Sequence, residues 1–230
     1  MSLSKKSILI TGASGFIGSF LVEGALNRGY TPWAGVRKSS SRKYLQHPDI
    51  QFIELDFSPQ AALKKSLETY KNEQGKFETI IHCAGVTKSK NKEEFIQFNY
   101  DQTRCFIDTL IELDMTPSQF VFISTLSVFG PIKEDNYQPI EESDKPQPNT
   151  AYGLSKLKTE EYIQSLPNFP YLLFRPTGVY GPREKDYFMM AQSIKNHFDF
   201  SVGFKKQEIT FVYVKDLVEA VFLGIDTKRT

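Results

Sequence analysis

The residue types best suited to chemistry in this chain are a tyrosine and a lysine, Tyr152 and Lys156, in a segment with a helical pattern. Residues four positions apart share one face of a helix, so the phenol and the ammonium can meet the same ligand. The free pKa is about 10 for tyrosine and about 10.4 for lysine. Because a nearby cation favours the phenolate, the pair predicts proton transfer by Tyr152. Aromatic and lysine pairs at this spacing are also common on helices without such a role.

A second group of polar side chains, Ser124, Thr125 and Ser127, ends an apolar run that is predicted to be a strand. A hydroxyl at a strand end can hydrogen-bond the carbonyl or alcohol of a substrate and hold it near the phenol. The alternative is a strand end that merely contains small polar residues.

A glycine-rich turn follows the short apolar run at residues 7–10. Such a turn lays the diphosphate of a dinucleotide on a helix N-terminus, because its glycines allow a tight turn, close approach to the phosphates and close helix packing. The alternative is a plain link between strand and helix. The helical pattern after the turn favours a dinucleotide site, formed by Gly12, Ser14, Gly15, Phe16, Ile17 and Gly18.

Short β-rich runs alternate with helical patterns through the first three quarters of the chain. This alternation implies right-handed crossovers, so we expect an α/β fold with a doubly wound parallel sheet of the Rossmann type. Ligands of such sheets bind beyond the carboxyl ends of the strands. The predicted strands are Ser7–Thr11, Thr31–Val36, Gln51–Leu55, Thr79–Cys83, Gln119–Ser124 and Tyr171–Arg175, and the predicted helices are Phe16–Arg28, Pro59–Tyr70, Lys92–Leu113 and Ala151–Ser165.

The remaining segments are less regular. The proline-containing stretch Pro131–Thr150 predicts an excursion over the surface, and after Arg175 we expect a helix at Arg183–His197, an extended segment at Phe200–Val214 and a final helix at Asp216–Ile225. We therefore predict a dinucleotide-binding domain over residues 1–175, completed by residues 210–226, and a small, incomplete substrate-binding lobe over residues 176–209.

The composition argues against several classes of protein. A net charge of +1 gives no general field for nucleic acid or an anionic membrane. No apolar stretch reaches the roughly 20 residues of a membrane span, and the first apolar run is shorter than the about 7–15 residues of a signal peptide. The two cysteines suggest no disulfide framework, and the three histidines show no metal-ligand spacing. We expect a soluble cytoplasmic protein without a metal.

Taken together, these segments resemble the extended short-chain dehydrogenase/reductases, in their NAD-dependent epimerase/dehydratase branch. The resemblance covers nearly the whole chain, and the ordered set of motifs is more specific than any one of them. The matching motifs are T-G-x-x-G-x-x-G from Thr11, H-x-A-G at His82–Gly85, N-x-x-x-T at Asn99 and Thr103, Y-x-x-x-K at Tyr152 and Lys156, R-P-x-x-V-Y-G-P from Arg175 and F-x-x-V-x-D from Phe211.

The resemblance implies a role for each matched residue. Tyr152 would be the general acid/base, and Lys156 would lower its pKa and hold the nicotinamide ribose. Thr125 would orient the reacting oxygen while hydride moves between the nicotinamide and a substrate carbon. The other implied cofactor residues are Asp56 and Phe57 beside the adenine, and Ala84, Gly85 and Asn99 in the cleft.

The choice between NADP and NAD is expected to depend on the residues after the second strand. An acid there would bind the ribose 2′-hydroxyl of NAD. This chain instead carries four cations and three serines over residues 37–43, with Arg37 placed first, and no acid before Asp49. Arg37 suits a forked contact with a 2′-phosphate, so we predict NADP, with NAD as the alternative. A solvated basic turn is the other interpretation.

Three departures from the family pattern narrow the function. Leu126-Ser127 stands where the dehydratases carry Asp-Glu, which argues against sugar dehydration. Gly178 replaces an asparagine that contacts substrate in the sugar-nucleotide enzymes. The chain ends at Thr230, where relatives generally continue, so a shortened form that binds cofactor without turnover is the alternative to an active enzyme.

Two functions remain open at this point. The first is an NAD(P)-dependent reductase or epimerase that acts on a small carbonyl compound, an alcohol or a sugar nucleotide. The second is a dinucleotide-binding sensor that controls a partner, against which the presence of Thr125, Tyr152 and Lys156 argues. The resemblance implies that the helix Lys92–Leu113 could pair with its copy in a homodimer, as in relatives, and we expect neither a nucleic acid nor a membrane partner.

Overall fold

The structure, a computed structural model of the chain, describes residues 6–133, 138–198 and 209–227. One parallel sheet has the strand order β3-β2-β1-β4-β5-β6, so β4 lies beside β1 although β2 and β3 come between them in the sequence. This reversal confirms the predicted doubly wound fold and creates a crevice at the carboxyl ends of β1 and β4. The strands are β1 (Ser7–Thr11), β2 (Thr31–Val36), β3 (Gln51–Glu54), β4 (Thr79–His82), β5 (Gln119–Ile123) and β6 (Tyr171–Phe174).

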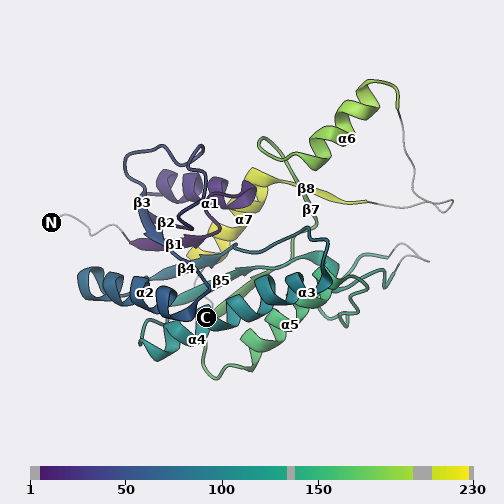
Figure 1. Cartoon of the computed structure of the whole chain (residues 1–230). Coiled ribbons are helices and arrows are strands. Elements are labelled where there is room, and N and C mark those ends of the chain that lie inside the picture. Colours follow the sequence, from purple (N-terminus) through teal and green to yellow (C-terminus); the bar gives the residue numbers. More distant parts are fainter. Residues whose placement is uncertain (1–5, 134–137, 199–208, 228–230) are drawn as a thin grey trace.

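Helices cover both faces of the sheet (Figure 1). On one face, α1 (Phe16–Asn27) and α7 (Val214–Asp226) pack on β1 and form one apolar cluster with it. On the other face, α2 (Gln60–Gln74), α4 (Gln102–Glu112) and α5 (Ala151–Ser165) form a second cluster. Because both faces are covered, the central strands are nearly continuous apolar runs, and every residue of β4 is buried.

The predicted single helix Lys92–Leu113 differs from the structure in its middle. It begins as α3 (Lys92–Phe95), continues as a π-helical turn, η1 (Ile96–Asp101), and ends as α4. A π-helical turn inserts one extra residue into a helix, and such turns are frequent at functional sites. The other predicted helices and the six predicted strands of this sheet are confirmed to within a few residues at their ends.

A second, two-stranded parallel sheet joins β7 (Gly178–Tyr180) to β8 (Phe211–Tyr213). Helix α6 (Asp186–Lys195) follows β7 and stands away from the main body (Figure 1), and none of its residues is buried. Residues 199–208, which belong to the predicted lobe and the predicted extended segment, lie outside the described residues. Within the part of the chain that the structure describes, no helix is long and apolar enough to cross a membrane.

Candidate active site

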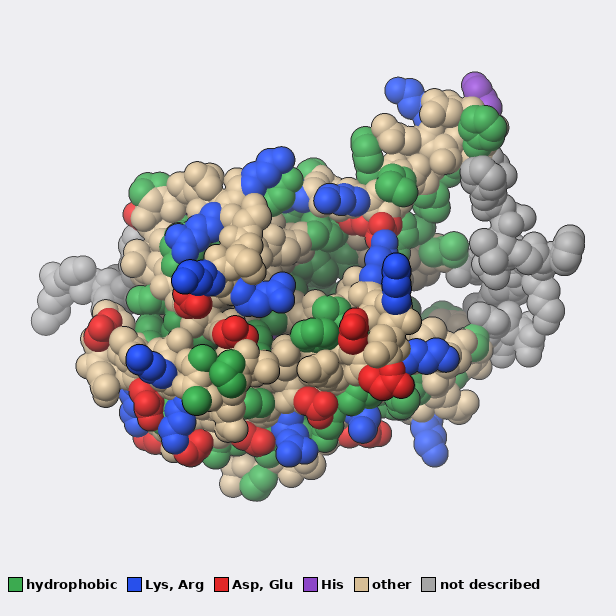
Figure 2. Space-filling view, viewed as in Figure 1, with side chains coloured by type: hydrophobic (Ala, Val, Ile, Leu, Met, Phe, Trp, Pro, Cys, Tyr) green, Lys and Arg blue, Asp and Glu red, His purple; other side chains and the backbone are tan. Residues whose placement is uncertain are grey.

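Two adjoining cavities lie at the carboxyl ends of the sheet strands. The first cavity, of about 530 Å³, is lined by the glycine-rich turn and the residues after β2 and β4. The second cavity, of about 740 Å³, is lined by the residues after β5 and the start of α5. Phe16, Ile17 and Gly85 line both, so one ligand can extend from one cavity into the other. Figure 2 shows this side of the molecule hollowed, with Lys and Arg side chains around the opening.

The glycine-rich turn is built so that only glycine fits at two of its positions. Gly12 has a φ of +66°, and a Cβ there would lie 2.8 Å from the backbone nitrogen of Ala84. A Cβ on Gly18 would lie 2.1 Å from the carbonyl oxygen of Gly12. No side chain caps the first turn of α1 at Gly15, so the free N–H groups of that turn suit an anion. The turn therefore fits the diphosphate of a dinucleotide.

Most of the residues predicted to bind a cofactor line the first cavity, but four do not. Asp56 is absent from its wall, and its Oδ1 accepts a hydrogen bond from the Ser58 N–H at 3.2 Å. Asn99 lines the second cavity instead, as do Tyr152 and Lys156, which were also predicted to contact the cofactor. The predicted residues that do line the first cavity are Gly12, Ser14, Gly15, Phe16, Ile17, Gly18, Arg37, Phe57, Ala84 and Gly85.

The basic segment after β2 presents one of its four cations to the first cavity. Arg37 lines it together with Ser40, whose Oγ accepts a hydrogen bond from the Arg37 N–H at 3.0 Å. The Arg42 guanidinium lies 4.2 Å from the ring centre of Phe52, and the Lys43 ammonium lies over a tyrosine ring. The charges of Arg42 and Lys43 thus stack on aromatic rings, whereas Arg37, the residue predicted to contact a 2′-phosphate, lines the cavity.

A buried polar network lies beneath the cavities. The Nδ1 of His82 is 2.9 Å from Thr11 Oγ1, and its Nε2 is 2.9 Å from Thr103 Oγ1. Thr11 Oγ1 also accepts a hydrogen bond from the Ala84 N–H at 3.2 Å. Burial lowers the pKa of His82 to about 3, so the ring is neutral at physiological pH. The network joins β1, β4 and α4 and fixes the backbone on which Ala84 and Gly85 lie.

Asn99 holds the loop after β4 against α5. Its Oδ1 accepts a hydrogen bond from the Val86 N–H at 2.8 Å, and its Nδ2 donates to the Val86 carbonyl and to Ser155 Oγ, each at 3.0 Å. The π-helical turn leaves the Asn99 carbonyl to accept a hydrogen bond from Thr159 Oγ1 at 2.9 Å. Because the amide is 1% exposed and already bonded, Asn99 positions the cleft wall.

Tyr152 and Thr125 meet in the second cavity. Thr150 caps α5 by accepting a hydrogen bond from the Gly153 N–H at 3.0 Å, which places Tyr152 in the first turn of the helix. Burial raises the pKa of the Tyr152 phenol, and a hydrogen bond with Thr125 opposes that rise. Thr125 Oγ1 also accepts a hydrogen bond from the Ser127 N–H at 3.2 Å. The two hydroxyl groups therefore face the same space.

Lys156 lies one turn further along α5 and is 5% exposed. Its ammonium donates a hydrogen bond to the Ile123 carbonyl at 2.6 Å and lies 4.1 Å from the ring centre of Phe122. Burial lowers the pKa of Lys156 from 10.5 to about 8. The expected lowering of the Tyr152 pKa by this ammonium is not seen: burial raises the pKa of the phenol, and the effect that opposes the rise comes from Thr125.

Two other parts of the site were not identified as such from the sequence. Arg175, the first residue of the R-P motif, forms hydrogen bonds of 2.7–3.2 Å with the buried carboxylate of Glu160 and so ties β6 to α5. Arg183, Glu184 and Lys185 line the first cavity. The run of charged residues was the available sequence signal for this part of the site. The partner of Arg183, Ser19, lies more than 100 positions away in the sequence, so the contact could not be inferred from that run.

The excursion Pro131–Thr150 contributes Pro131, Ile140 and Asn149 to the wall of the second cavity. Residues 134–137 of that segment lie outside the described residues. Among the described residues, no group of histidine, cysteine or acidic side chains is placed to hold a metal ion.

Known proteins share this sequence pattern and this architecture. A putative UDP-glucose 4-epimerase of Methanocaldococcus jannaschii is 28% identical over 96% of this chain and 74% of its own length. The sterol-4-alpha-carboxylate 3-dehydrogenase, decarboxylating, of Mus musculus is 26% identical over 98% of this chain and 60% of its own length. The chain thus spans from about three fifths to three quarters of these relatives.

Solved structures show the same fold. The UDP-glucose 4-epimerase of Thermus thermophilus, in complex with NAD, has a TM-score of 0.80 at 22% identity, over 97% of this chain and 75% of its own. The UDP-N-acetylglucosamine 4-epimerase of Methanobrevibacter ruminantium M1 has a TM-score of 0.80 at 21% identity, over 99% of this chain and 75% of its own. The model of the NAD-dependent epimerase/dehydratase family matches residues 8–230, and this chain belongs to that family.

Proposed function

We propose that the chain catalyses hydride transfer between a nicotinamide cofactor and a secondary alcohol or ketone, with Tyr152 as the general acid/base. One observation carries the proposal: Tyr152, Thr125 and Lys156 line a cavity that adjoins the glycine-rich turn. A dinucleotide with its diphosphate on that turn can extend its nicotinamide toward the three side chains. The cofactor supplies the hydride acceptor or donor when it is bound.

Each of the three side chains has its own role in the proposed reaction. Thr125 holds the reacting oxygen of the substrate by a hydrogen bond. Tyr152 donates a proton to that oxygen when a ketone is reduced and removes it when an alcohol is oxidised. Its raised pKa keeps the phenol protonated before the reaction, which suits a proton donor. Lys156 would hold the nicotinamide ribose.

The relatives support a ring alcohol as the substrate class. Their names describe changes at position 4 of a glucose in one case and at position 3 of a sterol in another. Both are positions on a ring, and the second cavity, of about 740 Å³, is large enough for one sugar ring beside the nicotinamide. We infer that a secondary ring alcohol, as found in a nucleoside diphosphate sugar, is oxidised or epimerised.

The cofactor proposed for this chain is NADP. Arg37 and Ser40 both line the first cavity at the end of β2, where no acid stands to accept a bond from a 2′-hydroxyl. A guanidinium and a hydroxyl there fit a 2′-phosphate. Titration with NADPH and NADH, followed by nicotinamide fluorescence, tests the choice. Arg37→Gln should weaken NADPH binding about tenfold and leave NADH within about twofold.

Arg42→Gln is the matched control, because Arg42 lies over Phe52 and does not line the cavity. It should preserve the ratio of the two affinities. Tighter binding of NADH than of NADPH by the unaltered protein would refute the choice of NADP.

Tyr152→Phe tests the catalytic proposal. This change removes only the phenolic oxygen, so turnover with a panel of sugar nucleotides and ring ketones should fall by at least about 10²-fold. Cofactor affinity should stay within about twofold of the unaltered protein. Phe95→Leu is a control, since the Phe95 ring centre lies 6.1 Å from that of Tyr152 and the side chain has no group that can donate or accept a proton. Undiminished turnover in Tyr152→Phe would exclude the acid/base role.

A further inference from the structure

A short segment crosses from β7 to α6 and carries four charged side chains in succession, Arg183, Glu184, Lys185 and Asp186; we call it the strap. The first three of these residues line the first cavity together with the glycine-rich turn. The strap is therefore part of the wall around the site proposed for the dinucleotide.

The first charged side chain of the strap, Arg183, bonds residues of α1. Arg183 Nη1 donates a hydrogen bond to Ser19 Oγ at 2.8 Å, and its other Nη pairs with the Glu23 carboxylate. The guanidinium also lies 4.2 Å from the ring centre of Phe20 and 4.5 Å from that of Tyr44. Since the Ser19 N–H bonds the Gly15 carbonyl at 3.0 Å, Arg183 sits beside the first turn of α1.

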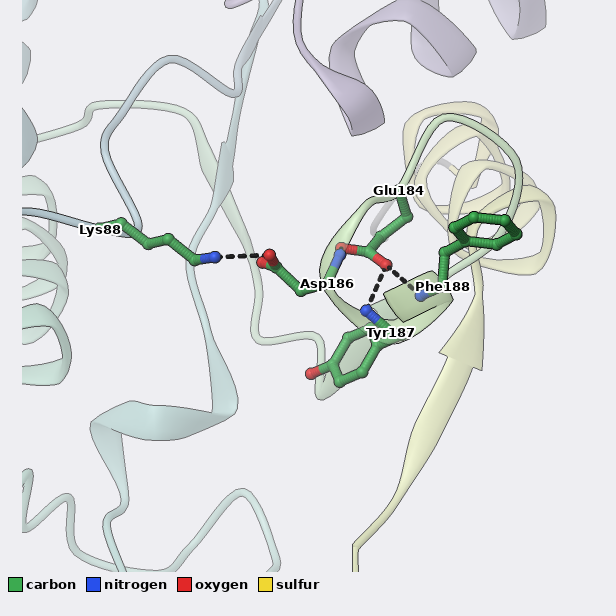
Figure 3. A network of polar contacts seen from close by, with 5 residues as sticks. All are labelled: Lys88, Glu184, Asp186, Tyr187 and Phe188. Carbon is green, nitrogen blue, oxygen red and sulfur yellow. Dashed lines mark hydrogen bonds and ion pairs between the residues drawn. The ribbon is translucent and has the colours of Figure 1, made fainter. Parts of the chain in front are cut away.

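The last charged side chain of the strap, Asp186, forms an ion pair on a different wall of the cleft. The Asp186 carboxylate pairs with the Lys88 ammonium at 2.5 Å, and Lys88 belongs to the loop after β4 (Figure 3). The strap is thus fixed at two points, on α1 and on that loop. Its middle residues are held between these two anchors.

Glu184 also has partners, in the first turn of α6. Its carboxylate accepts hydrogen bonds from the backbone N–H groups of Asp186, Tyr187 and Phe188, at 2.8, 2.7 and 3.3 Å (Figure 3). A carboxylate at a helix N-terminus is stabilised both by these donors and by the helix dipole. Glu184 therefore caps α6, and its charge is largely satisfied there.

Lys185 is the exception among the four charges. Its ammonium makes no hydrogen bond or ion pair with any described residue, although Lys185 is one of the residues that line the first cavity. The same cavity is lined by the first turn of α1, whose free N–H groups already favour an anion, and Arg183, two residues before Lys185, bonds Ser19 in that helix. We propose that Lys185 binds the diphosphate of the dinucleotide and supplies the side-chain cation that the glycine-rich turn does not.

This inference rests on the proposed dinucleotide site, and two fragments of the cofactor separate them. ADP-ribose contains the diphosphate, whereas 2′-AMP contains only the adenosine and the 2′-phosphate. By calorimetry, Lys185→Gln should bind ADP-ribose about five- to tenfold more weakly and 2′-AMP within about twofold of the unaltered protein. Lys185→Arg should retain most of the ADP-ribose affinity.

Lys195→Gln is the matched control, because Lys195 is an exposed lysine in the last turn of α6 that lines neither cavity. It should change neither affinity. The loss caused by Lys185→Gln should shrink when NaCl is raised from about 50 mM to about 500 mM, since salt screens an exposed charge.

Equal affinity of Lys185→Gln and the unaltered protein for ADP-ribose would overturn the proposal for Lys185 and leave the dinucleotide site in place. An equal loss for both fragments would also overturn it, because the effect would not be confined to the diphosphate. Failure of the unaltered protein to bind either fragment would refute the dinucleotide site itself, and the role of Lys185 with it.

Discussion

Replacement of Lys156 by methionine is expected to stabilise the cofactor-free protein at neutral pH and to remove its activity. Lys156 is 5% exposed, and burial lowers its pKa from 10.5 to about 8. At about 1.4 kcal/mol per pH unit, the folded state disfavours the charged lysine by roughly 3 kcal/mol. Methionine fills the same space without a charge. It leaves the Ile123 carbonyl without the ammonium donor, which costs about 1–3 kcal/mol.

The dependence on pH is the sharper part of this prediction. Between pH 8 and 10.5 the unfolded chain holds a proton on Lys156 that the folded chain has released. The unaltered protein therefore gains stability relative to Lys156→Met as the pH rises through this window. Urea unfolding at pH 7 and pH 9.5 should show the advantage of the variant shrink by about 2 kcal/mol.

Lys158→Met is the matched control on the same helix, because Lys158 is exposed. Its stability should stay within about 0.5 kcal/mol of the unaltered protein at both pH values. A difference between Lys156→Met and the unaltered protein that does not change with pH would refute the reasoning. Burial of the Lys156 ammonium would then not reduce the free energy of unfolding.

Two further substitutions test the framework around the site. Gly18→Ala should abolish cofactor binding or destabilise the protein by more than about 2 kcal/mol, because the new Cβ would lie 2.1 Å from the Gly12 carbonyl oxygen. Fluorescence titration measures the first effect and thermal unfolding the second. Glu160→Ala should cost about 3–5 kcal/mol in urea unfolding, because it leaves the Arg175 guanidinium without its buried partner; a cost below about 1 kcal/mol would contradict that view.

The regular part of the fold could be predicted because its signals are local. Each central strand is a short apolar run bounded by turn residues, and the end of β5 is marked by a change to Ser124 and Thr125. Helix α5 matches its predicted bounds, since Thr150 caps it and the residues after Ser165 break the pattern. These features need no knowledge of distant contacts.

The parts that escaped prediction depend on contacts between distant residues. The π-helical turn has almost the same apolar periodicity as an α-helix, and its reason, the bonding of Asn99 to Val86 and Ser155, appears only in three dimensions. Strand β7 is three residues long and exists through its pairing with β8. The strap carries a clear charge pattern, but the partners of Arg183 lie in α1, at the other end of the sequence.

The histidine beneath the cleft has a consequence for acid tolerance. His82 is enclosed by hydrogen bonds and aromatic rings, and its pKa falls from 6.5 to about 3. Between these values an unfolded chain takes up a proton that the native imidazole refuses, so acidification draws the population toward unfolding. Over the same range the native His82 ring carries no charge. Mild acid should thus lower the free energy of unfolding of the native protein while the His82 ring beneath the cleft stays neutral.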